Sequence, residues 1–205
     1  MPKGLTTLLS VLGLALASTG SGPAPRVDGG DAPSLTGQLL VATDDLRDPR
    51  FQHTVIYMVH HDASGAMGLV VNQPLADAPL APLLEKLGRD SKGATGTIRI
   101  HYGGPVEPGK GFVLHTSDWA GGESHVVRDG VAFTTDPAVF DAVARGTGPR
   151  RSLFAIGYAG WGPGQLEAEI ARGDWITVSG DEALIFGDDA GSKWERAMER
   201  RKIAL

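Results

Sequence analysis

Apolar residues recur along the chain in short runs, and several of the runs predict strands. Gln38–Ala42, Thr54–His60 and Gly68–Asn72 are nearly continuous apolar or β-branched segments, which is typical of buried strands. The turn sequence Asp-Ala-Ser-Gly at 62–65 separates the second segment from the third. Because these residues favour tight turns, we expect the two strands to form a hairpin.

Later strands are predicted by alternation or by apolar runs. Ile98, Ile100 and Tyr102 alternate with Arg99 and His101, which is typical of a half-buried strand. The runs Gly111–His115, Ser152–Tyr158, Trp175–Val178 and Ala183–Phe186 predict four further strands.

A helical period appears in other segments. Four leucines are spaced as one face of a short helix that ends at Gly88; they are Leu80, Leu83, Leu84 and Leu87. Three more helices are expected: from the N-cap Asp136 and Pro137 to about Arg145, over Gln165–Arg172, and at the C-terminus with Trp194, Ala197 and Met198 on one face. Strands and helices mix without a regular βαβ rhythm, which favours the α+β class.

Composition describes a globular chain of 205 residues, 41% hydrophobic and 21% charged, with room for one ordinary domain or two small ones. Its 29 glycines are about twice the usual share, and with 13 prolines they predict many tight turns between short elements. The absence of cysteine excludes disulfides, thiolate catalysis and Cys-ligated zinc, and leaves the redox compartment open.

The charge balance argues against nucleic acid as a partner. The formal net charge is −5, whereas nucleic-acid-binding domains carry a basic excess that neutralises phosphates. The basic run Lys193–Lys202 is expected to be the solvated face of a terminal helix. No helix-turn-helix pattern is visible, so direct nucleic-acid binding is not expected.

The first 17 residues are typical of a secretory signal peptide. Lys3 precedes the apolar run Leu5–Leu16, and Ala15-Leu16-Ala17 fits a small-x-small cleavage site. Residues 18–34 are rich in Gly, Pro, Ser and Asp and predict a flexible linker, followed by a domain over 35–205. Cleavage would make the protein periplasmic or secreted, with no transmembrane span in the mature chain. The alternative is translation from a start near Leu35 and a cytoplasmic location.

Four segments together resemble the YqgE/AlgH family. They are LTGQLLVATDDLRDPRFQHTVIYMVHHDASGAMGLVVNQPL (Leu35–Leu75), YGGPV (Tyr102–Val106), GFVLHT (Gly111–Thr116) and AIGYAGWGPGQLEAEI (Ala155–Ile170). The resemblance implies a single complex α+β domain, with a bifurcated sheet that includes a small closed β-barrel and is surrounded by helices. Some family members carry a transcriptional-regulator label, but the resemblance implies no particular reaction or cofactor.

Two glycine-rich segments are candidates for ligand contact. The loop Gly157–Gly164, which contains Gly160 and Trp161, joins a predicted strand to a predicted helix. It is either a phosphate cradle or a tight turn, and the lack of a following Lys-Ser/Thr excludes a Walker A loop. The Gly103-Gly104-Pro105 turn would serve as an oxyanion hole only beside a nucleophile and a base. No G-x-S-x-G elbow occurs, so a structural turn is the simpler interpretation.

Polar candidates are sparse. Asn72 ends a predicted strand, where its side chain either caps the turn or contacts a ligand. His115 ends an apolar strand and is expected to be a hydrogen-bonded, half-buried histidine. His61 is expected in a solvated loop with Asp62.

The spacing of the six histidines matches no metal motif, so neither a metal nor a cofactor is expected. Glu167 and Glu169 lie two positions apart on one predicted helix and cannot face each other, so they are a poor candidate for a paired-carboxylate site.

Three functional hypotheses follow from these patterns. The leading one is a non-enzymatic binding or regulatory module that acts through a protein partner, because no complete catalytic constellation is present. The rival is an enzyme whose pocket unites the Gly-Gly-Pro turn and the Gly-rich loop with Asn72 and His115. The third is binding of a nucleotide or small anion at the Gly-rich loop without catalysis. The candidate ligand contacts are Asn72, Gly103, Gly104, His115, Gly160 and Trp161. The oligomeric state stays open.

Overall fold

The computed structural model describes residues 33–203, and their side chains up to residue 201. The predicted signal peptide and most of the predicted linker therefore lie outside the described residues. The strands of the described part are β1 Gln38–Ala42, β2 Val55–Asp62, β3 Gly65–Val70, β4 Pro74–Pro79, β5 Thr97–Tyr102, β6 Val106–Thr116, β7 Ser124–Arg128, β8 Val131–Thr134, β9 Ser152–Trp161 and β10 Trp175–Ser179. Its α-helices are α1 Leu80–Lys86, α2 Ala138–Ala144, α3 Gln165–Ala171, α4 Glu182–Phe186 and α5 Lys193–Ile203, with 3-10 turns η1 Pro49–Phe51 and η2 Ala190–Ser192.

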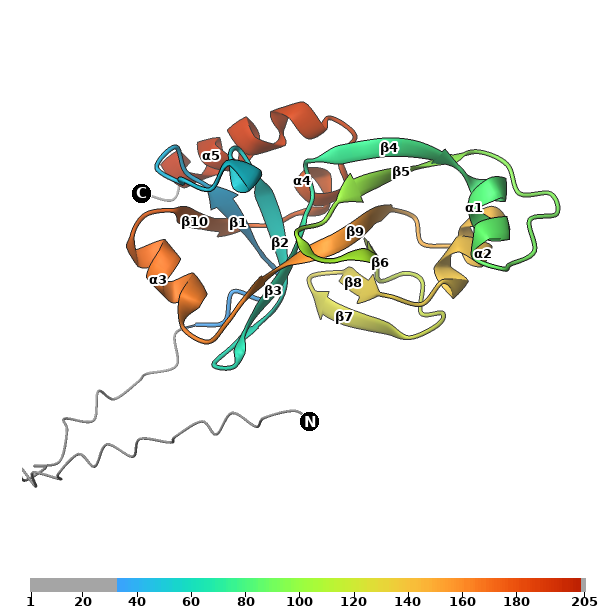
Figure 1. Ribbon diagram of the computed structural model, residues 1–205, viewed down its shortest axis with the longest axis horizontal. Coiled ribbons are helices and arrows are strands. Elements are labelled where there is room, and N and C mark those ends of the chain that lie inside the picture. Colours follow the sequence, from blue (N-terminus) through green and yellow to red (C-terminus); the bar gives the residue numbers. More distant parts are fainter. Residues whose placement is uncertain (1–32, 204–205) are drawn as a thin grey trace, which may run out of the picture. The chain divides into compact units, whose positions relative to one another are not determined.

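The sheet divides at β9, the long strand that crosses the domain in Figure 1. β6 pairs along one edge of β9. On the other edge, β5 pairs in parallel with the first half, where Ile100 lies opposite Phe154, and β3 pairs antiparallel with the end, where Met67 lies opposite Gly160. β4 extends the β5 branch as an antiparallel hairpin. The predicted bifurcation of the sheet is thus present.

The main path of the sheet runs β10-β1-β2-β3-β9-β6-β8-β7 and is antiparallel throughout. It curls strongly, which brings the side chain of Arg128 in β7 against Gly37, directly before β1. Within residues 33–203 no ladder joins the end strands β10 and β7, so the pairing shows a curled, partly closed sheet rather than the closed barrel expected from the resemblance. The fold is a mixed α/β fold with helices around this sheet.

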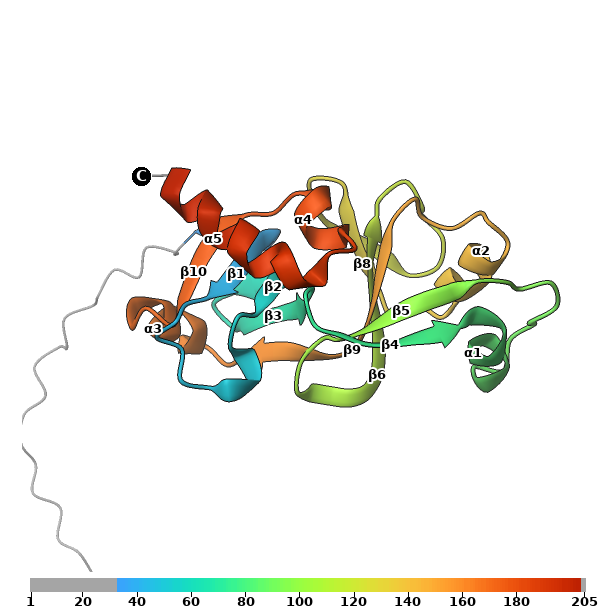
Figure 2. The ribbon, with the colours of Figure 1, turned by 90° about the horizontal axis from the view of Figure 1, so that it is seen from above.

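Helices cover the sheet at two ends, as Figures 1 and 2 show: α1 and α2 beside the β4–β5 branch, and α3 and α5 beside β1 and β10. Along α5, Ala197 is fully buried and the indole Nε1 of Trp194 donates to the carbonyl of Ala42 at 2.8 Å. The predicted apolar face of the last helix is therefore confirmed. In the described part of the chain, no helix combines the length and apolarity needed to span a membrane.

One predicted strand is wrong. The apolar run Ala183–Phe186 forms the helix α4, because the carboxylate of Asp181 accepts a hydrogen bond from the N–H of Leu184 at 2.8 Å and caps the first turn. A short apolar run fits a buried helix as well as a strand, so periodicity alone does not separate the two.

Local patterns also misplace some elements. β4 and β7 are absent from the prediction: β4 contains two prolines and is mostly exposed, so its sequence lacks the apolar signal of a strand. Leu80 and Leu84 in α1 are buried, but Leu87, which directly follows the helix, is 42% exposed. His101 in β5 is buried, at 8% exposure, although it alternates in sequence with the apolar positions. Arg99, two positions earlier on the same face, is exposed, so alternation does not separate buried from exposed positions along β5.

Candidate functional site

A cleft of about 920 Å³ opens where the loop after β1 faces α3, the end of β9 and the start of β10. We call it the tryptophan cleft. Its apolar lining consists mainly of Leu46, Phe51, Trp161 and Trp175. The two indole rings are arranged edge to face, with centroids 6.1 Å apart, and Phe51 meets Trp175 in the same way at 5.9 Å. The cleft wall is therefore a packed aromatic cluster.

Glu169 holds this aromatic cluster in place. Its Oε2 accepts hydrogen bonds from the indole Nε1 of Trp161 at 2.8 Å and of Trp175 at 2.9 Å. The other carboxylate oxygen accepts from Gln165 Nε2 at 2.9 Å, one turn earlier on α3. Hydrogen bonds to a carboxylate are strong, and these three occupy both oxygens. Glu169 therefore fixes the cleft wall.

Arginine–aspartate pairs line the rim. Arg50 binds Asp48 with Nε at 3.0 Å and Nη2 at 2.6 Å, and the same hydrogen bond holds the pKa of Asp48 below its usual value. The Arg50 guanidinium also lies 5.7 Å from the ring centre of Phe51. On the opposite side, Arg172 binds Asp174 at 2.7 Å. Paired in this way, the rim charges are partly neutralised before any ligand arrives.

Of the six predicted ligand contacts, two line the tryptophan cleft: Gly160 and Trp161. Pro105, the last residue of the Gly-Gly-Pro turn, lines it as well. Gly103 and Gly104 are buried behind the cleft against β9. A methyl group on Gly103 would overlap the carbonyl of Gly157, and one on Gly104 would overlap the backbone of Tyr158. Both glycines thus allow two backbones to approach, as expected for a structural turn.

The other two predicted contacts lie elsewhere in the fold. Asn72 accepts from the N–H of Val55 at 2.9 Å and donates to the carbonyl of His53 at 2.8 Å, so it fastens the start of β2. His115 is fully buried, with Nδ1 2.9 Å from the carbonyl oxygen of Thr116 and Nε2 3.1 Å from Ser124 Oγ. Burial lowers the pKa of His115. The convergence of these residues with the Gly-rich loop, which the enzyme hypothesis requires, does not occur.

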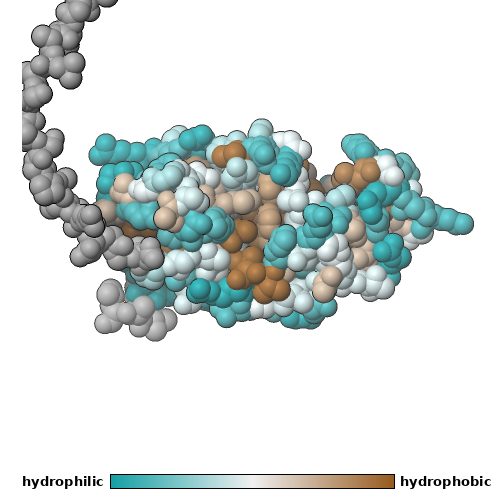
Figure 3. Space-filling view, turned by 90° about the horizontal axis from the view of Figure 1, so that it is seen from below, coloured by the Kyte–Doolittle hydropathy of each residue, from teal (hydrophilic) through white to brown (hydrophobic). Residues whose placement is uncertain are grey.

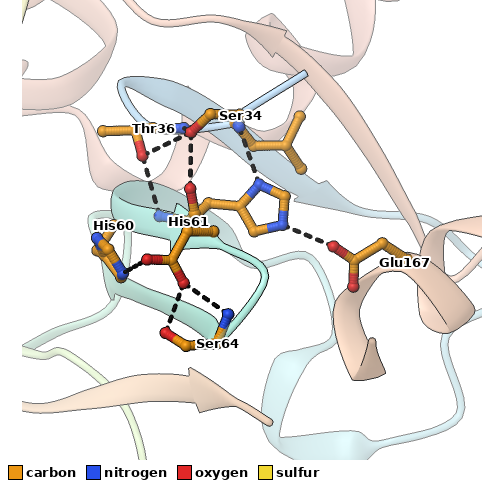
Figure 4. Close-up of polar contacts among 8 residues, drawn as sticks. Ser34, Thr36, His60, His61, Ser64 and Glu167 are labelled. Atoms are coloured by element: carbon orange, nitrogen blue, oxygen red, sulfur yellow. Dashed lines mark hydrogen bonds and ion pairs between the residues drawn. The ribbon is translucent and has the colours of Figure 1, made fainter. Parts of the chain in front are cut away.

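Another polar cluster surrounds His61, which was predicted to lie in a solvated loop but is buried at 7% exposure (Figure 4). Its Nδ1 accepts from the N–H of Leu35 at 3.0 Å, and Nε2 lies 2.8 Å from Glu167 Oε1. The backbone of His61 also binds the hydroxyls of Ser34 and Thr36, at 2.8 and 2.9 Å. These contacts close over the ring and fasten the start of the domain.

Sequence reasoning missed the polar centre of the tryptophan cleft. Glu169 was considered as half of a carboxylate pair with Glu167, and the two side chains indeed point apart, one to the indoles and one to His61. Trp175 is predicted only as the start of a strand, and nothing in the sequence spacing indicates that it or the loop between Asp44 and Arg50 meets α3. In residues 33–203 no group of three His, Asp or Glu side chains is placed to hold a metal ion.

Comparisons with known proteins agree with this fold. The model of a family described as AlgH-like matches residues 39–205. A UPF0301 protein from Methylococcus capsulatus is 44% identical over 88% of this chain and 98% of its own length, and one from Caulobacter vibrioides is 44% identical over 88% and 93%.

Solved structures agree as well. The solution structure of the AlgH protein from Pseudomonas aeruginosa is 36% identical and aligns with a TM-score of 0.69 over 88% of this chain and 92% of that one. A crystal structure of a protein from Corynebacterium diphtheriae, 18% identical, shares the fold with a TM-score of 0.66 over 82% and 87%. With the fold, the motifs and these relatives in agreement, the chain belongs to the YqgE/AlgH family.

Proposed function

We propose that this protein is a non-enzymatic binding module that acts through a protein partner, and that the tryptophan cleft receives a segment of that partner. The observation that carries the proposal is the fixed aromatic wall: two indoles held by Glu169, and the phenyl ring of Phe51 packed edge to face on Trp175, beside arginines on the rim. Trp and Arg are the residues that most often dominate binding energy at protein interfaces. A wall fixed in advance also lowers the entropic cost of binding.

The lining of the tryptophan cleft favours recognition over chemistry. All of its lining residues lie in the described part of the chain, and among them is no serine, threonine, histidine, lysine or tyrosine. Asp48 and Asp174 are paired with arginines, and Glu169 accepts three hydrogen bonds. A nucleophile beside a base would be needed for acyl or phosphoryl transfer through a covalent intermediate.

The charges of the cleft disfavour a nucleotide or a small anion as ligand. Five carboxylates line it against three guanidinium groups, those of Arg47, Arg50 and Arg172. At the start of α3, Glu167 further opposes an anion at the Gly-rich loop. Protein segments carry both charge signs and apolar side chains, so they match this mixed lining better. Direct nucleic-acid binding is not part of the proposal, since the net charge is −5.

Site-specific photo-cross-linking in the native host tests the proposal. A benzophenone amino acid replaces Arg47, which is exposed on the rim of the cleft, and in a control it replaces Lys92, which is exposed and lies outside the cleft lining. We expect one discrete protein adduct from position 47 and none from position 92. The adduct should disappear when Phe51→Ala removes part of the wall. Equal adducts at both positions, or an adduct that Phe51→Ala leaves unchanged, would contradict the proposal.

We also propose that the protein is exported, with a cytoplasmic form as the alternative. Support comes from the charged, apolar and small-residue segments of residues 1–17. Intact-mass measurement of the protein from fractionated cells tests this point. Loss of residues 1–17 from a periplasmic or secreted form is the expected result, and an intact cytoplasmic chain would contradict export.

A further inference from the structure

The charged side chains that line the tryptophan cleft do not cancel one another. Two of its carboxylates have a guanidinium of their own: Asp48 is bound by Arg50 at 2.6 Å, and Asp174 by Arg172 at 2.7 Å. The remaining guanidinium of the lining, that of Arg47, is exposed and forms no ion pair within residues 33–203. One positive charge of the cleft is therefore free.

Three carboxylates of the lining are not bound by a lysine or arginine of the described chain: Asp44, Asp45 and Glu169. Asp44 and Asp45 are exposed on the loop that follows β1. The imidazole of His53 lies 3.8 Å from Asp44, and an imidazole is charged only when it is protonated. Three free carboxylates against one free guanidinium leave the cleft with an excess of two negative charges.

The charge of Glu169 lies at the aromatic wall itself. Its three hydrogen-bond donors, the indoles of Trp161 and Trp175 and the amide of Gln165, are all neutral. They satisfy the carboxylate oxygens but leave the negative charge without a counter-ion. Glu169 is half-buried, and charges attract more strongly near a protein wall than in bulk water. A cation that enters the cleft is therefore favoured beside Glu169.

Burial of apolar surface alone would favour another part of the molecule. Apolar side chains gather in the middle of the face seen in Figure 3. Val126, at 70% exposure, is the most exposed large apolar residue within residues 33–201. The indoles of the cleft are 8% exposed at Trp161 and 2% at Trp175, so they form its floor. A ligand of the cleft thus needs an apolar part of limited area and a charged group that reaches the rim.

We propose that the partner segment received by the tryptophan cleft presents a basic side chain, lysine or arginine, whose aliphatic stem lies on the aromatic wall and whose charge is balanced by Asp44, Asp45 and Glu169. Lysine and arginine combine such a stem with a cationic head group. This inference rests on the proposed function and names the chemistry of its partner. The net charge of −5 adds a long-range attraction for a basic segment.

NMR of the indole N–H groups in the full chain tests the charge preference. The probes are acetyl-Leu-Lys-Leu-amide and two peptides in which glutamine or glutamate replaces the lysine. We expect the lysine peptide to shift the signals of Trp161 and Trp175 saturably, with a millimolar Kd as is usual for so small a ligand. The glutamine peptide should bind several-fold more weakly, and the glutamate peptide should not bind. Trp119, which packs on His115 outside the cleft lining, is the internal control.

Neutral variants test the carboxylates. Asp44→Asn combined with Asp45→Asn removes two exposed charges and should weaken the lysine peptide several-fold while the Trp119 signal keeps its position. Asp90→Asn, at an exposed residue outside the cleft lining, should leave the affinity unchanged. In the cross-linking experiment, the same double variant should reduce the adduct from position 47.

Three results would overturn the inference: no shift with the lysine peptide, equal affinity for the three peptides, or an affinity that the double variant leaves unchanged. If the adduct from position 47 still forms in that case, the partner proposal stands and the partner segment is not basic. Loss of the position-47 adduct from the parent protein would overturn the partner proposal as well.

Discussion

The imidazole of His61 and the carboxylate of Glu167 meet with 2.8 Å between Nε2 and Oε1, across 106 positions of the sequence. Because Nδ1 accepts the N–H of Leu35, the proton of the neutral ring must be on Nε2 and is donated to Glu167. The pair therefore joins three distant segments: the start of the domain, β2 and α3. Figure 4 shows these contacts converging on the ring.

Replacing Glu167 by glutamine should have a small, pH-dependent effect on stability. Hydrogen bonds from its own backbone and from His61 hold the pKa of Glu167 below its usual value. Such a carboxylate stabilises the fold above the unfolded glutamate pKa, about 4.3, and loses the contribution as pH falls through the folded value. The side chain is 43% exposed, so Glu167→Gln should cost less than about 1 kcal/mol at pH 7.

Urea unfolding at neutral and acidic pH measures this difference. It should shrink as pH falls below the unfolded glutamate pKa of about 4.3, and vanish once the carboxylate has taken up its proton in the folded state as well. A difference that grows on acidification would contradict the pairing with His61.

Replacing Glu169 by alanine should damage the tryptophan cleft much more than Glu167→Ala. The substitution leaves the indole N–H groups of Trp161 and Trp175 without their acceptor, at a cost of roughly 2–5 kcal/mol for the pair. Chemical unfolding gives the stability, and tryptophan fluorescence should shift to the red as water reaches the rings. Equal losses from Glu167→Ala, two residues away on α3, would mean that the indoles do not depend on Glu169.

Gly103→Ala should destabilise the fold by at least about 3 kcal/mol or prevent folding, because the methyl group would overlap the carbonyl of Gly157. Gly109→Ala is the matched control, since an added methyl group there meets no atom within 4 Å. It should stay within about 0.5 kcal/mol of the parent. Thermal unfolding of the two variants separates these outcomes, and similar midpoints would refute the close backbone approach.

Tyr57→Phe should leave stability unchanged or raise it by up to about 1–2 kcal/mol. The hydroxyl of Tyr57 is buried in the core, and within the described residues it has no hydrogen-bond partner. Its removal therefore relieves an unsatisfied polar group. Thr134→Val is the contrasting change, because that buried hydroxyl donates to the carbonyl of Glu123 at 2.9 Å. It should cost about 1–3 kcal/mol by equilibrium unfolding. A large loss from Tyr57→Phe would reveal a hidden partner.

The stability of the parent protein should rise as pH increases from about 8 toward about 10.4. Burial lowers the pKa of Lys193 to about 8 in the fold, whereas an unfolded lysine titrates near 10.4. Between these values the unfolded chain binds more protons than the native one, and stability then increases with pH. Urea unfolding from pH 7 to 10 should show this rise in the parent and lose it in Lys193→Met. Lys92→Met, at an exposed residue, should retain it.

Part of the fold follows from local patterns. β1 has the predicted bounds, the helix that begins at Gln165 ends close to its predicted end, and the C-terminal helix buries its predicted face. These features follow from apolar period, turn residues and glycine stops, which act over a few neighbouring positions. The strand prediction for Ala183–Phe186 is wrong because a short apolar run fits a buried helix equally well, and Asp181 caps the first turn of a helix there. The sequence does not predict β4, because this strand is held by its pairing with β5 and not by its own side chains.

The sequence by itself determined the family. The bifurcated sheet followed from the resemblance, and a structural turn was the simpler interpretation of the Gly-Gly-Pro segment. Only the tertiary structure decided the sites. It placed Gly103 against Gly157, joined Glu169 to Trp161 and Trp175, and buried His61 beneath Leu35. Several of these contacts join residues far apart in the chain, and no spacing rule covers them. Their energies come from desolvation and hydrogen-bond geometry in the packed fold, which no local pattern encodes.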